Sequence, residues 1–445
     1  MALFLLIVVC CVECLLMATS LITRSYREQA RGIIHILAFV VFAPLVLSSV
    51  IEWSFRWYGP AVLLLVWAAF GAIRLSKHNG HDQEFQARRV ILKAVSALLL
   101  VFIAITPALI FPQYMLPEAT GNYEVGLVQY TFVDESRIER YSNSGGYRKL
   151  NVECWHPKYA DDKYPLVVFS HGGLGTKTSN ESLYIELASN GYVVCSIDHA
   201  YHSFWTKFED GTVAWLSMEY FTELQREDAK TDKQQSYGYY QKWMTIRTGD
   251  ISFVIDTIME KASKDTDGVY SLVDVERIGV IGHSFGGSAA LGVPRQRDDI
   301  DAVIALESPF MYDIVGVENN EFVWLDEAYP VPVLNIYSDA SWSHLSEWTQ
   351  YARNYEFLSN APDDVLNLHL PGRGHFSLTD LALASPLLVR LLEGGEVTRD
   401  SKEYLQTVNK VCLEFFDRYL KDRGEFTSSL YQDRRLHENT FVSVQ

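Results

Sequence analysis

One serine of the chain stands in a setting that suits nucleophilic catalysis. Ser284 is the central residue of the pentapeptide Gly-His-Ser-Phe-Gly, which follows an apolar β-type run at residues 278–281 and precedes a run of small residues. This is the G-x-S-x-G pattern of a nucleophile elbow, a sharp turn between a strand and a helix that exposes the serine hydroxyl. Gly282 and Gly286 leave room for the strand and the helix to approach closely around a strained serine backbone. The pattern predicts that Ser284 is a nucleophile.

A serine hydroxyl is a weak nucleophile and needs a base within hydrogen-bond reach. In proteins with this elbow, an acid and then a histidine follow the serine along the chain. His375 lies in the segment Pro-Gly-Arg-Gly-His-Phe at residues 371–376, a glycine-rich loop after the last strand-like run. His369 lies within that run and His344 comes before it, and His437 is the remaining later histidine. We therefore expect His375 to be the base.

The tetrahedral intermediate of acyl transfer needs hydrogen-bond donors for its oxyanion. The backbone N–H of Phe285, directly after the nucleophile, is expected to be one of two donors. The segment Phe-Ser-His-Gly-Gly-Leu-Gly at residues 169–175 follows an earlier strand-like run, and its glycines let backbone amides turn inward. Gly173 or Leu174 is expected to supply the second donor. A phosphate-binding loop is the alternative for this segment, but no lysine follows it at Walker spacing.

The composition limits the partners and cofactors of this chemistry. The 445 residues carry a formal net charge of −17, which argues against nucleic acid because phosphate binding needs a basic face. The six cysteines form no metal-like or paired pattern, so Cys154 and Cys195 are expected to be separate buried side chains rather than a disulfide. His199 and His202 are the nearest approach to a ligand set, and such an isolated pair is more often structural. No cofactor or metal is predicted.

The elements that could position these residues begin near residue 125. Strand-like apolar runs alternate with helical stretches at residues 182–190, 246–258 and 284–292, which is typical of a mostly parallel sheet covered on both faces. This α/β domain is expected over residues 125–423, closed by helices at 378–392 and 403–420 and followed by a tail at 424–445. The strand-like runs lie at residues 127–132, 150–155, 166–170, 192–197, 278–281, 302–306, 333–337 and 365–370.

An insertion at residues 203–245 is dense in phenylalanine, tyrosine and tryptophan. It can be interpreted as a small packed cap. The alternative is a lid or apolar wall over the active site, which could also touch lipid.

Residues 1–113 differ from the rest of the chain in having four long apolar runs, at residues 2–22, 33–51, 57–73 and 94–111. About 20 apolar residues are needed to cross a bilayer as a helix, so we expect a bundle of about four transmembrane helices. A cleaved signal peptide is rejected for the first run because no basic residue precedes it and further spans follow. Residues 114–124 are expected to be a linker.

The basic residues between the runs predict the orientation in the membrane. They fall between runs one and two and between runs three and four, and the positive-inside rule places both loops in the cytoplasm. The N-terminus and the α/β domain are then extracytoplasmic. Glu13, inside the first run, is either a functional polar site or a carboxyl satisfied within the bundle. The basic residues are Arg24, Arg27 and Arg31 in the first loop and Arg74, Lys77, Arg88, Arg89 and Lys93 in the second.

Four segments together carry a family resemblance: the elbow Gly-His-Ser-Phe-Gly-Gly, the Phe-Ser-His-Gly loop, Leu-Ala-Ser-Asn-Gly-Tyr-Val-Val at 187–194, and Ile-Ala-Leu-Glu at 304–307. From about residue 126 to 422, the chain resembles the plasma-type platelet-activating factor acetylhydrolases. The resemblance implies the α/β-hydrolase fold and a phospholipase activity that needs no metal. Two departures stand out, since the family usually has His-Gly-Leu-Gly in the oxyanion loop and an aspartate at the position of Glu307.

Two residues compete for the role of the triad acid. Asp339 follows the strand-like run at 333–337, but the usual pattern there is Gly-Asp-x-Asp, whose second carboxylate meets the histidine. Here Ser341 fills that second place. Glu307 stands at the position where the family that the chain resembles has its acid, and its longer side chain can still reach an imidazole N–H. We expect the triad Ser284, His375 and Glu307, with Asp339 as the alternative acid.

These observations predict a membrane-anchored serine hydrolase that cleaves carboxylic esters through an acyl-enzyme. The resemblance implies short or oxidised acyl chains of phospholipids as substrates, with membrane lipid as a further partner. One alternative is a general or polyester-type carboxylesterase, which would share the elbow and the fold. Another is a non-catalytic sensor with a hydrolase-like domain. The sequence gives no oligomeric state.

Overall fold

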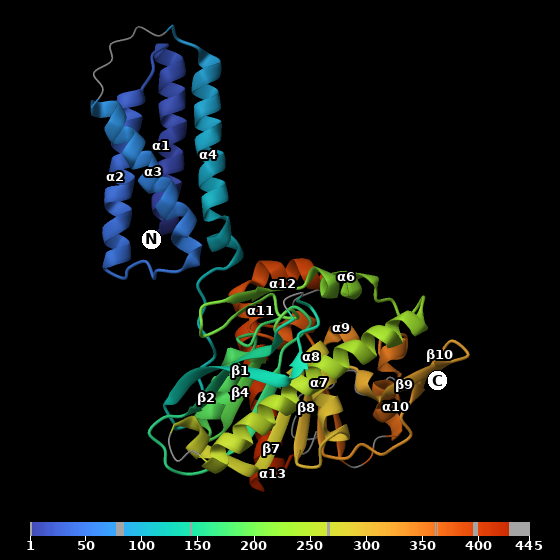
Figure 1. Ribbon diagram of the computed structural model, residues 1–445. Helices are drawn as coiled ribbons and strands as arrows, with labels where there is room; N and C mark the ends of the chain where they lie inside the picture. Colours follow the sequence, from blue (N-terminus) through green and yellow to red (C-terminus); the bar gives the residue numbers. More distant parts are fainter. Residues whose placement is uncertain are drawn as a thin grey trace. The chain divides into compact units, whose positions relative to one another are not determined.

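The computed structural model describes residues 2–76, 84–142, 145–264, 268–360, 362, 364–394 and 399–426 (Figure 1). Lys77 and most of the predicted tail, from residue 427 onward, lie outside the described residues. Contacts between residues divide the chain into two compact units. The helical unit comprises Met1–Tyr114 and Ala384–Leu388, and the α/β unit comprises Met115–Leu383 and Val389–Gln445.

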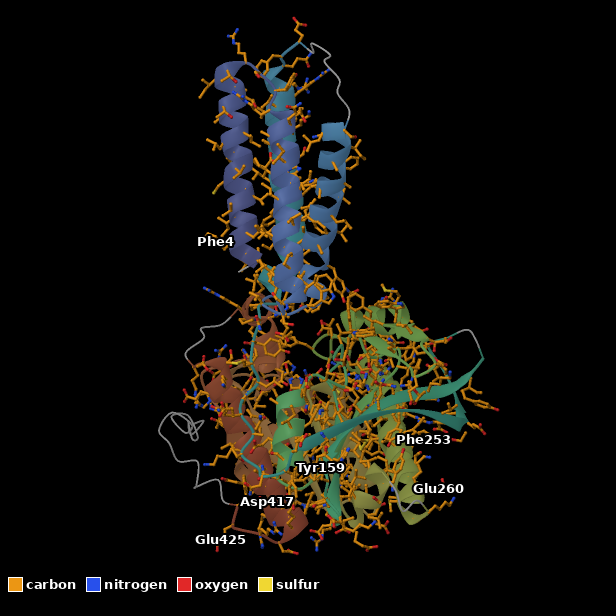
Figure 2. All side chains as sticks on the ribbon, turned by 90° about the vertical axis from the view of Figure 1, so that its left-hand side faces the viewer. Phe4, Tyr159, Phe253, Glu260, Asp417 and Glu425 are labelled. Carbon is orange, nitrogen blue, oxygen red and sulfur yellow. A yellow bond between two sulfur atoms is a disulfide. The ribbon has the colours of Figure 1, made fainter. Side chains whose placement is uncertain are left out.

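The helical unit is built from four long helices, each of which overlaps one of the predicted apolar runs. They are α1 (Ala2–Thr23), α2 (Glu28–Leu47), α3 (Tyr58–Ser76) and α4 (Ala87–Ile110). Large apolar side chains such as Phe4 project outward from these helices (Figure 2). A helix of 22 residues, the length of α1, is about 33 Å long, which matches the hydrocarbon thickness of a bilayer. All four helices are therefore candidate membrane spans by length and composition.

Close packing inside the helical unit depends on small residues and on one buried carboxyl. A Cβ atom on Gly71 of α3 would lie 2.6 Å from the carbonyl oxygen of Gly32 on α2, so glycine allows these helices to touch. The buried Glu13 carboxylate accepts a hydrogen bond from His35 Nε2 at 2.8 Å and pairs with Arg31 at 2.9 Å. The structure therefore supports the second interpretation of Glu13, a carboxyl that is satisfied by partners within the bundle.

The α/β unit contains an eight-stranded sheet with the order β1-β2-β4-β3-β7-β8-β11-β12. The pairs β1–β2 and β2–β4 are antiparallel, and the remaining pairs are parallel. All the predicted strand-like runs fall in this sheet, which confirms the mostly parallel architecture. The strands are β1 (Val125–Ile138), β2 (Tyr147–Pro157), β3 (Tyr164–Ser170), β4 (Val193–Asp198), β7 (Val273–His283), β8 (Ala302–Leu306), β11 (Val333–Tyr337) and β12 (Val365–His369).

Helices cover both faces of the sheet because its central strands are apolar on both sides. In β3, Leu166 and Val168 belong to the core that contains α7 (Lys233–Lys264) and α8 (Phe285–Gly292). Val167 and Phe169 belong to the opposite core, with α5 (Glu181–Ser189) and α13 (Ser401–Lys421). Successive side chains of a strand point to opposite faces, so a continuous apolar run predicts this double covering.

Two helices differ from their predicted bounds. α7 extends well beyond the predicted 246–258, so the last part of the predicted insertion belongs to it. The prediction of a single closing helix at 378–392 is wrong, because the structure has two short helices there, α11 (Leu381–Ala384) and α12 (Pro386–Glu393). Pro386 lacks an N–H and disfavours helical backbone at the residue before it, which breaks the helix there.

The remaining elements are short, and along the chain they connect the strands of the main sheet. The insertion folds as a hairpin of β5 (Trp205–Lys207) and β6 (Val213–Trp215), followed by α6 (Met218–Arg226) and the start of α7. A second hairpin, a one-turn helix and a longer helix follow β8 and β11. These are β9 (Ile314–Glu318), β10 (Glu321–Trp324), α9 (Asp339–Trp342) and α10 (Ala352–Asn360).

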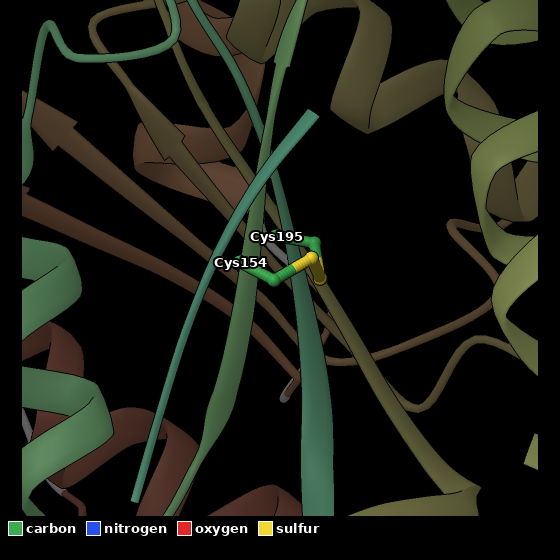
Figure 3. The surroundings of a disulfide bond; sticks show 2 residues. All are labelled: Cys154 and Cys195. Carbon is green, nitrogen blue, oxygen red and sulfur yellow. A yellow bond between two sulfur atoms is a disulfide. The ribbon is translucent and has the colours of Figure 1, made fainter. Parts of the chain in front are cut away.

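The expectation of separate thiols at Cys154 and Cys195 is wrong, because the two form a disulfide (Figure 3). The residues stand directly opposite each other in the antiparallel pair β2–β4, with their Cα atoms 4.2 Å apart. They are 41 residues apart in sequence, and only the strand order brings them together. In the chain-entropy model, closing a loop of this length stabilises the fold by about 4 kcal/mol.

Candidate active site

Ser284 lies at the sharp turn between β7 and α8. Its backbone is strained, with φ at 53° and ψ at −123°. A Cβ atom on Gly282 would lie 2.4 Å from the carbonyl carbon of Gly286, and one on Gly286 would lie 2.0 Å from the carbonyl oxygen of Ser170. Any side chain at either position would collide with backbone, as the elbow pattern predicts.

His375 links the serine to an acid. It begins a short 3₁₀ turn after β12, at the end of the predicted glycine-rich loop. Its Nε2 atom lies 2.8 Å from Ser284 Oγ, and its Nδ1 atom lies 2.9 Å from Glu307 Oε2. Both distances are within normal hydrogen-bond range, so the three side chains form one continuous hydrogen-bonded chain.

The Glu307 carboxylate is buried directly after β8 and is held from several sides. It accepts hydrogen bonds from Ser338 Oγ at 2.7 Å, from the Ser341 N–H at 2.8 Å and from His375. Burial alone would raise the pKa of this carboxyl, but the hydrogen bond and charge of His375 and the bonds from Ser341 and Ser338 lower the pKa to about 2. Glu307 is therefore ionised at neutral pH.

The structure does not bring Asp339 to His375. Asp339 accepts a hydrogen bond from His369 Nε2 at 2.9 Å and another from the Gly372 N–H at 2.7 Å. Its side chain is 48% exposed, against 1% for Glu307. His369 ends β12, as expected, and its ring stacks on Trp342 with ring centroids 4.6 Å apart. Asp339, the alternative acid, therefore hydrogen-bonds His369 and not His375.

The loop at residues 171–175 passes next to the nucleophile. A Cβ atom on Gly172 would lie 3.5 Å from Ser284 Cβ, so this backbone crosses the turn at van der Waals distance. Gly173 lines the same cavity as Ser284, while Leu174 is 41% exposed. Within the described residues, the N–H groups of Gly173, Leu174 and Phe285 donate no hydrogen bond to another residue. Each is therefore free to bind an oxyanion.

Ser284 and His375 open into a cavity of about 340 Å³. Its wall is mainly apolar, and the insertion contributes part of it through α6, the following segment and α7. The polar exceptions include Glu227, whose carboxylate accepts a hydrogen bond from Tyr240 at 2.6 Å. The insertion thus forms a wall of the cavity. Apolar lining residues are Leu224, Trp243, Phe285, Pro309, Met311 and Trp348.

The His199 and His202 pair lies away from the cavity, in a buried polar network. His199 bonds Asp250 at 2.8 Å, and His202 Nδ1 accepts a hydrogen bond from Arg247 Nε at 3.1 Å. Burial lowers the pKa of both imidazoles, to about 3 for His199, so both are neutral. Among the described residues, no three histidine, cysteine or acidic side chains gather in a way that could hold a metal ion.

Sequence reasoning missed the donors that hold the acid. Ser338 and Ser341 flank Asp339, and both bind Glu307 from the end of the neighbouring strand. The sequence carried no signal for Ser341, because it donates its backbone N–H, which any residue other than proline at that place would supply.

Comparison with known proteins identifies a family for this chain. Residues 113–433 match the family model described as "Platelet-activating factor acetylhydrolase, isoform II". The chain belongs to this family. The match covers the entire sheet and all the residues of the hydrogen-bonded chain, and it leaves the four long helices outside.

Individual relatives are distant in sequence. A platelet-activating factor acetylhydrolase of Cavia porcellus is 22% identical over 62% of this chain and 62% of its own length. The Bos taurus protein of the same name is 25% identical over 60% of this chain and 59% of its own length. A Thermobifida alba protein, cutinase est2, is 23% identical over 55% of this chain and 62% of its own length. The chain thus spans about three fifths of the length of these curated relatives.

A solved structure shares the fold. The ferulic acid esterase of Streptomyces cinnamoneus superimposes with a TM-score of 0.52 at 22% identity, over 69% of this chain and 93% of its own. Taken together with the mostly parallel sheet, this likeness agrees with the α/β-hydrolase fold that the resemblance implied.

Proposed function

We propose that this protein is a serine hydrolase that cleaves carboxylic esters, with Ser284 as nucleophile, His375 as base and Glu307 as the orienting acid. The observation that carries the proposal is the pair of hydrogen bonds made by His375, at 2.8 Å to Ser284 and 2.9 Å to Glu307. Family membership supports it, because relatives are named as acetylhydrolases and as a cutinase.

The first half of the reaction acylates the serine. Ser284 Oγ attacks the ester carbonyl carbon while His375 Nε2 accepts the hydroxyl proton. The negative charge on the carbonyl oxygen is stabilised by the N–H of Phe285 and by that of Gly173 or Leu174. The tetrahedral intermediate collapses, His375 returns the proton to the leaving alkoxide, and an alcohol departs.

The second half of the reaction releases the acid. Water attacks the acyl carbon, His375 accepts one of its protons, and the same N–H groups stabilise the second oxyanion. Collapse breaks the bond to Ser284 Oγ, which regains a proton from His375. Glu307 holds the imidazole with its Nδ1–H toward the carboxylate in both halves and stabilises the imidazolium that forms.

The substrates proposed are esters with short acyl chains, including short or oxidised acyl chains of phospholipids. A cavity of about 340 Å³ with an apolar wall suits a small acyl group, and the acetylhydrolase names of the relatives point the same way. A general or polyester-type carboxylesterase is the second candidate, favoured by the likeness to a cutinase.

A chain-length profile separates these candidates. Hydrolysis of p-nitrophenyl esters from acetate to palmitate is measured beside phosphatidylcholines with a short or a long acyl chain at the second position. We expect a maximum at two to six carbons and cleavage of the short-chain phosphatidylcholine alone. Cleavage of polyester film without phospholipid cleavage would favour the second candidate. No turnover of any ester would favour a ligand sensor.

We further propose that the four long helices anchor the protein and that the α/β unit is extracytoplasmic. The span lengths support insertion, and the basic residues around α1–α2 and α3–α4 support the orientation. The disulfide adds a third argument, since the cytosol keeps thiols reduced. A reporter active only in the cytoplasm, fused after Gln445, should give no signal. A strong signal would mean an odd number of crossings or the opposite orientation of the four helices.

A further inference from the structure

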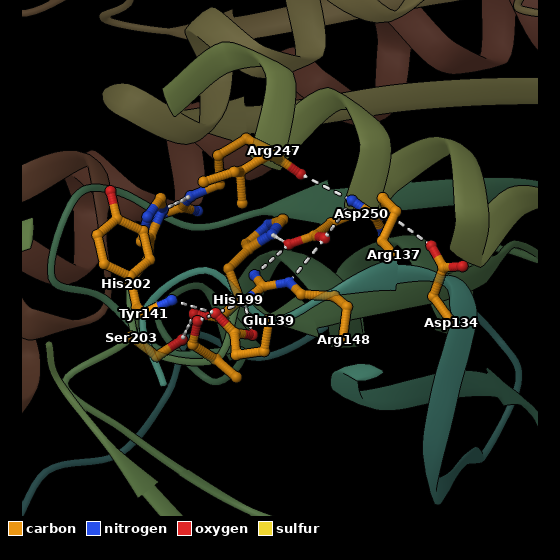
Figure 4. Close-up of polar contacts among 12 residues, drawn as sticks. Asp134, Arg137, Glu139, Tyr141, Arg148, His199, His202, Ser203, Arg247 and Asp250 are labelled. Atoms are coloured by element: carbon orange, nitrogen blue, oxygen red, sulfur yellow. Dashed lines mark hydrogen bonds and ion pairs between the residues drawn. The ribbon is translucent and has the colours of Figure 1, made fainter. Parts of the chain in front are cut away.

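A buried arginine, Arg247, donates hydrogen bonds to the loop that is proposed to supply the second oxyanion donor, and Figure 4 shows it beside His202. Arg247 of α7 is fully buried, and among the described residues no carboxylate forms an ion pair with it. The nearby Asp250 is already occupied by Arg148, Arg137 and His199. Burial lowers the pKa of the Arg247 guanidinium, which reflects the cost of keeping this cation out of water.

The Arg247 guanidinium donates instead to the backbone of the oxyanion loop. Nη1 lies 3.0 Å from the carbonyl oxygen of His171, and Nη2 lies 3.4 Å from that of Gly172. A neighbouring side chain holds the next carbonyl, since the Tyr220 hydroxyl donates to the Gly173 oxygen at 2.9 Å. Three successive carbonyl groups are therefore fixed from one side.

Fixing these carbonyls fixes the N–H groups as well. A peptide unit is planar and trans, so the C=O of one residue and the N–H of the next point in opposite directions. The bond from Arg247 to the Gly172 carbonyl therefore turns the Gly173 N–H away from the arginine, toward the cavity that Gly173 lines. By the same reasoning, Tyr220 orients the N–H of Leu174. The Gly172 carbonyl also accepts from His171 Nδ1 at 2.7 Å and from the Gly175 N–H at 3.2 Å, so Arg247 is one of three groups that hold this peptide plane.

The same guanidinium also contacts the residue that carries the first donor. Its carbon Cζ lies 5.0 Å from the ring centroid of Phe285, within cation–π distance. His202, which accepts the Nε–H of Arg247, stacks on Tyr220 with ring centroids 3.9 Å apart. Arg247 thus contacts both the oxyanion loop and the side chain of Phe285, and its positive charge at the Gly172 carbonyl polarises the N–H of Gly173.

We infer that Arg247 is a positioning residue, which sets the peptide planes of the oxyanion loop for transition-state stabilisation. This inference rests on the proposed function. It assigns no contact between Arg247 and the substrate: the residue acts through the N–H of Gly173 and, together with Tyr220, through that of Leu174.

The test compares Arg247→Met with a matched control in the full-length protein. Arg295 is a suitable control because its side chain is only 5% exposed, donates to a backbone carbonyl, that of Ala328 at 2.8 Å, and lies over the ring of Tyr329 at 5.1 Å; unlike Arg247, it also pairs with a carboxylate, that of Asp313. It does not line the cavity of Ser284. The measurements are kcat and KM for p-nitrophenyl acetate, the inhibition constant of a trifluoromethyl ketone, and the thermal midpoint.

We expect Arg247→Met to lower kcat about 100-fold with a change in KM below about threefold, as for the loss of one oxyanion donor. The inhibition constant of the ketone, which forms an oxyanion on the serine, should rise in parallel with the loss of kcat/KM. Arg295→Met should lower the thermal midpoint with kcat within about threefold of wild type. Arg247→Lys should recover part of kcat, and Tyr220→Phe should lower kcat about tenfold.

A folded Arg247→Met protein with kcat within threefold of wild type would overturn the inference. So would an equal loss of kcat in Arg295→Met at a similar thermal midpoint. If Arg247→Met does not fold, Arg247→Lys and Tyr220→Phe decide, and normal ketone inhibition in both would overturn it. A wild-type protein that hydrolyses no ester and binds no ketone would instead refute the proposed function, and the inference with it.

Discussion

Two acids follow adjacent parallel strands of the sheet, and each holds a histidine. Glu307 follows β8 and bonds His375, which touches Ser284; Asp339 follows β11 and bonds His369, which stacks on Trp342. Glu307 is buried and takes donors from three residues, while Asp339 is half exposed and its second donor is the backbone of Gly372. The comparison teaches that the partner and the surroundings of an acid determine its role, more than its type or its place in a familiar pattern.

The comparison predicts its largest effect for Glu307→Gln. An amide cannot stabilise the imidazolium or keep the ring in the required tautomer, and the corresponding change in a serine-protease triad lowers kcat by about 10⁴-fold. We expect a loss of similar size, with KM little changed. Steady-state kinetics on p-nitrophenyl acetate measure it, and circular dichroism checks the fold. A loss below about tenfold would remove Glu307 from the triad.

The second prediction concerns pH and stability. The pKa of Glu307 in the folded protein, about 2, lies below its ordinary value of 4.5. A group of this kind contributes stability that is fully present above pH 4.5 and is lost as the pH falls toward 2. This lowering of the pKa corresponds to about 3 kcal/mol in the free energy of unfolding.

The corresponding measurement is the thermal midpoint of wild type and Glu307→Gln in detergent, at several values between pH 6 and pH 2. The advantage of the wild type should shrink by several degrees over this range. A difference between the two proteins that stays constant with pH would contradict the pKa assigned to Glu307.

A third, smaller effect is expected for Ser338→Ala. Ser338 Oγ donates to Glu307 and also caps α9, so its removal weakens the hold on the carboxylate without removing the charge. A loss of about tenfold in kcat, or about 1.4 kcal/mol, is expected. Ser343→Ala is the matched control, because Ser343 is an exposed hydroxyl that bonds the Asp339 carbonyl. Equal losses in the two variants would show that Ser338 acts through α9 alone.

The smallest effect is predicted for Asp339→Asn. Asparagine keeps one acceptor oxygen for the Gly372 N–H, and its NH2 group can donate to the Nε2 of a neutral His369, while no bond to His375 is lost. The value of kcat should stay within about threefold of wild type. If Asp339→Asn proves more damaging than Glu307→Gln, the roles of the two acids are reversed.

Much of the α/β unit could be predicted because its signals are local. Continuous apolar runs such as 302–306 and 333–337 coincide with β8 and β11, and the glycine spacing around Ser284 reports a turn that only glycine permits. The break at Pro386 was equally local and could have been recognised.

What could not be predicted depends on strand order. The disulfide requires β4 to lie beside β2, and the contacts of Ser338 and Ser341 with Glu307 require β11 to lie beside β8. Arg247 gave no signal in the sequence either, because it reaches the oxyanion loop from a helix 75 residues away. Such contacts are set by the packing of distant segments, and periodicity does not report them.

Covalent labelling tests the central claim most directly. A fluorophosphonate probe reacts with a serine only where a base and oxyanion donors activate it, so the adduct identifies the nucleophile. The protein is incubated with the probe, digested and mapped by mass spectrometry, with Ser284→Ala as the parallel sample. We predict a single adduct on Ser284, no labelling in Ser284→Ala, and a loss of esterase activity by several orders of magnitude in that variant. Labelling at another serine, or labelling that persists in Ser284→Ala, would contradict the account.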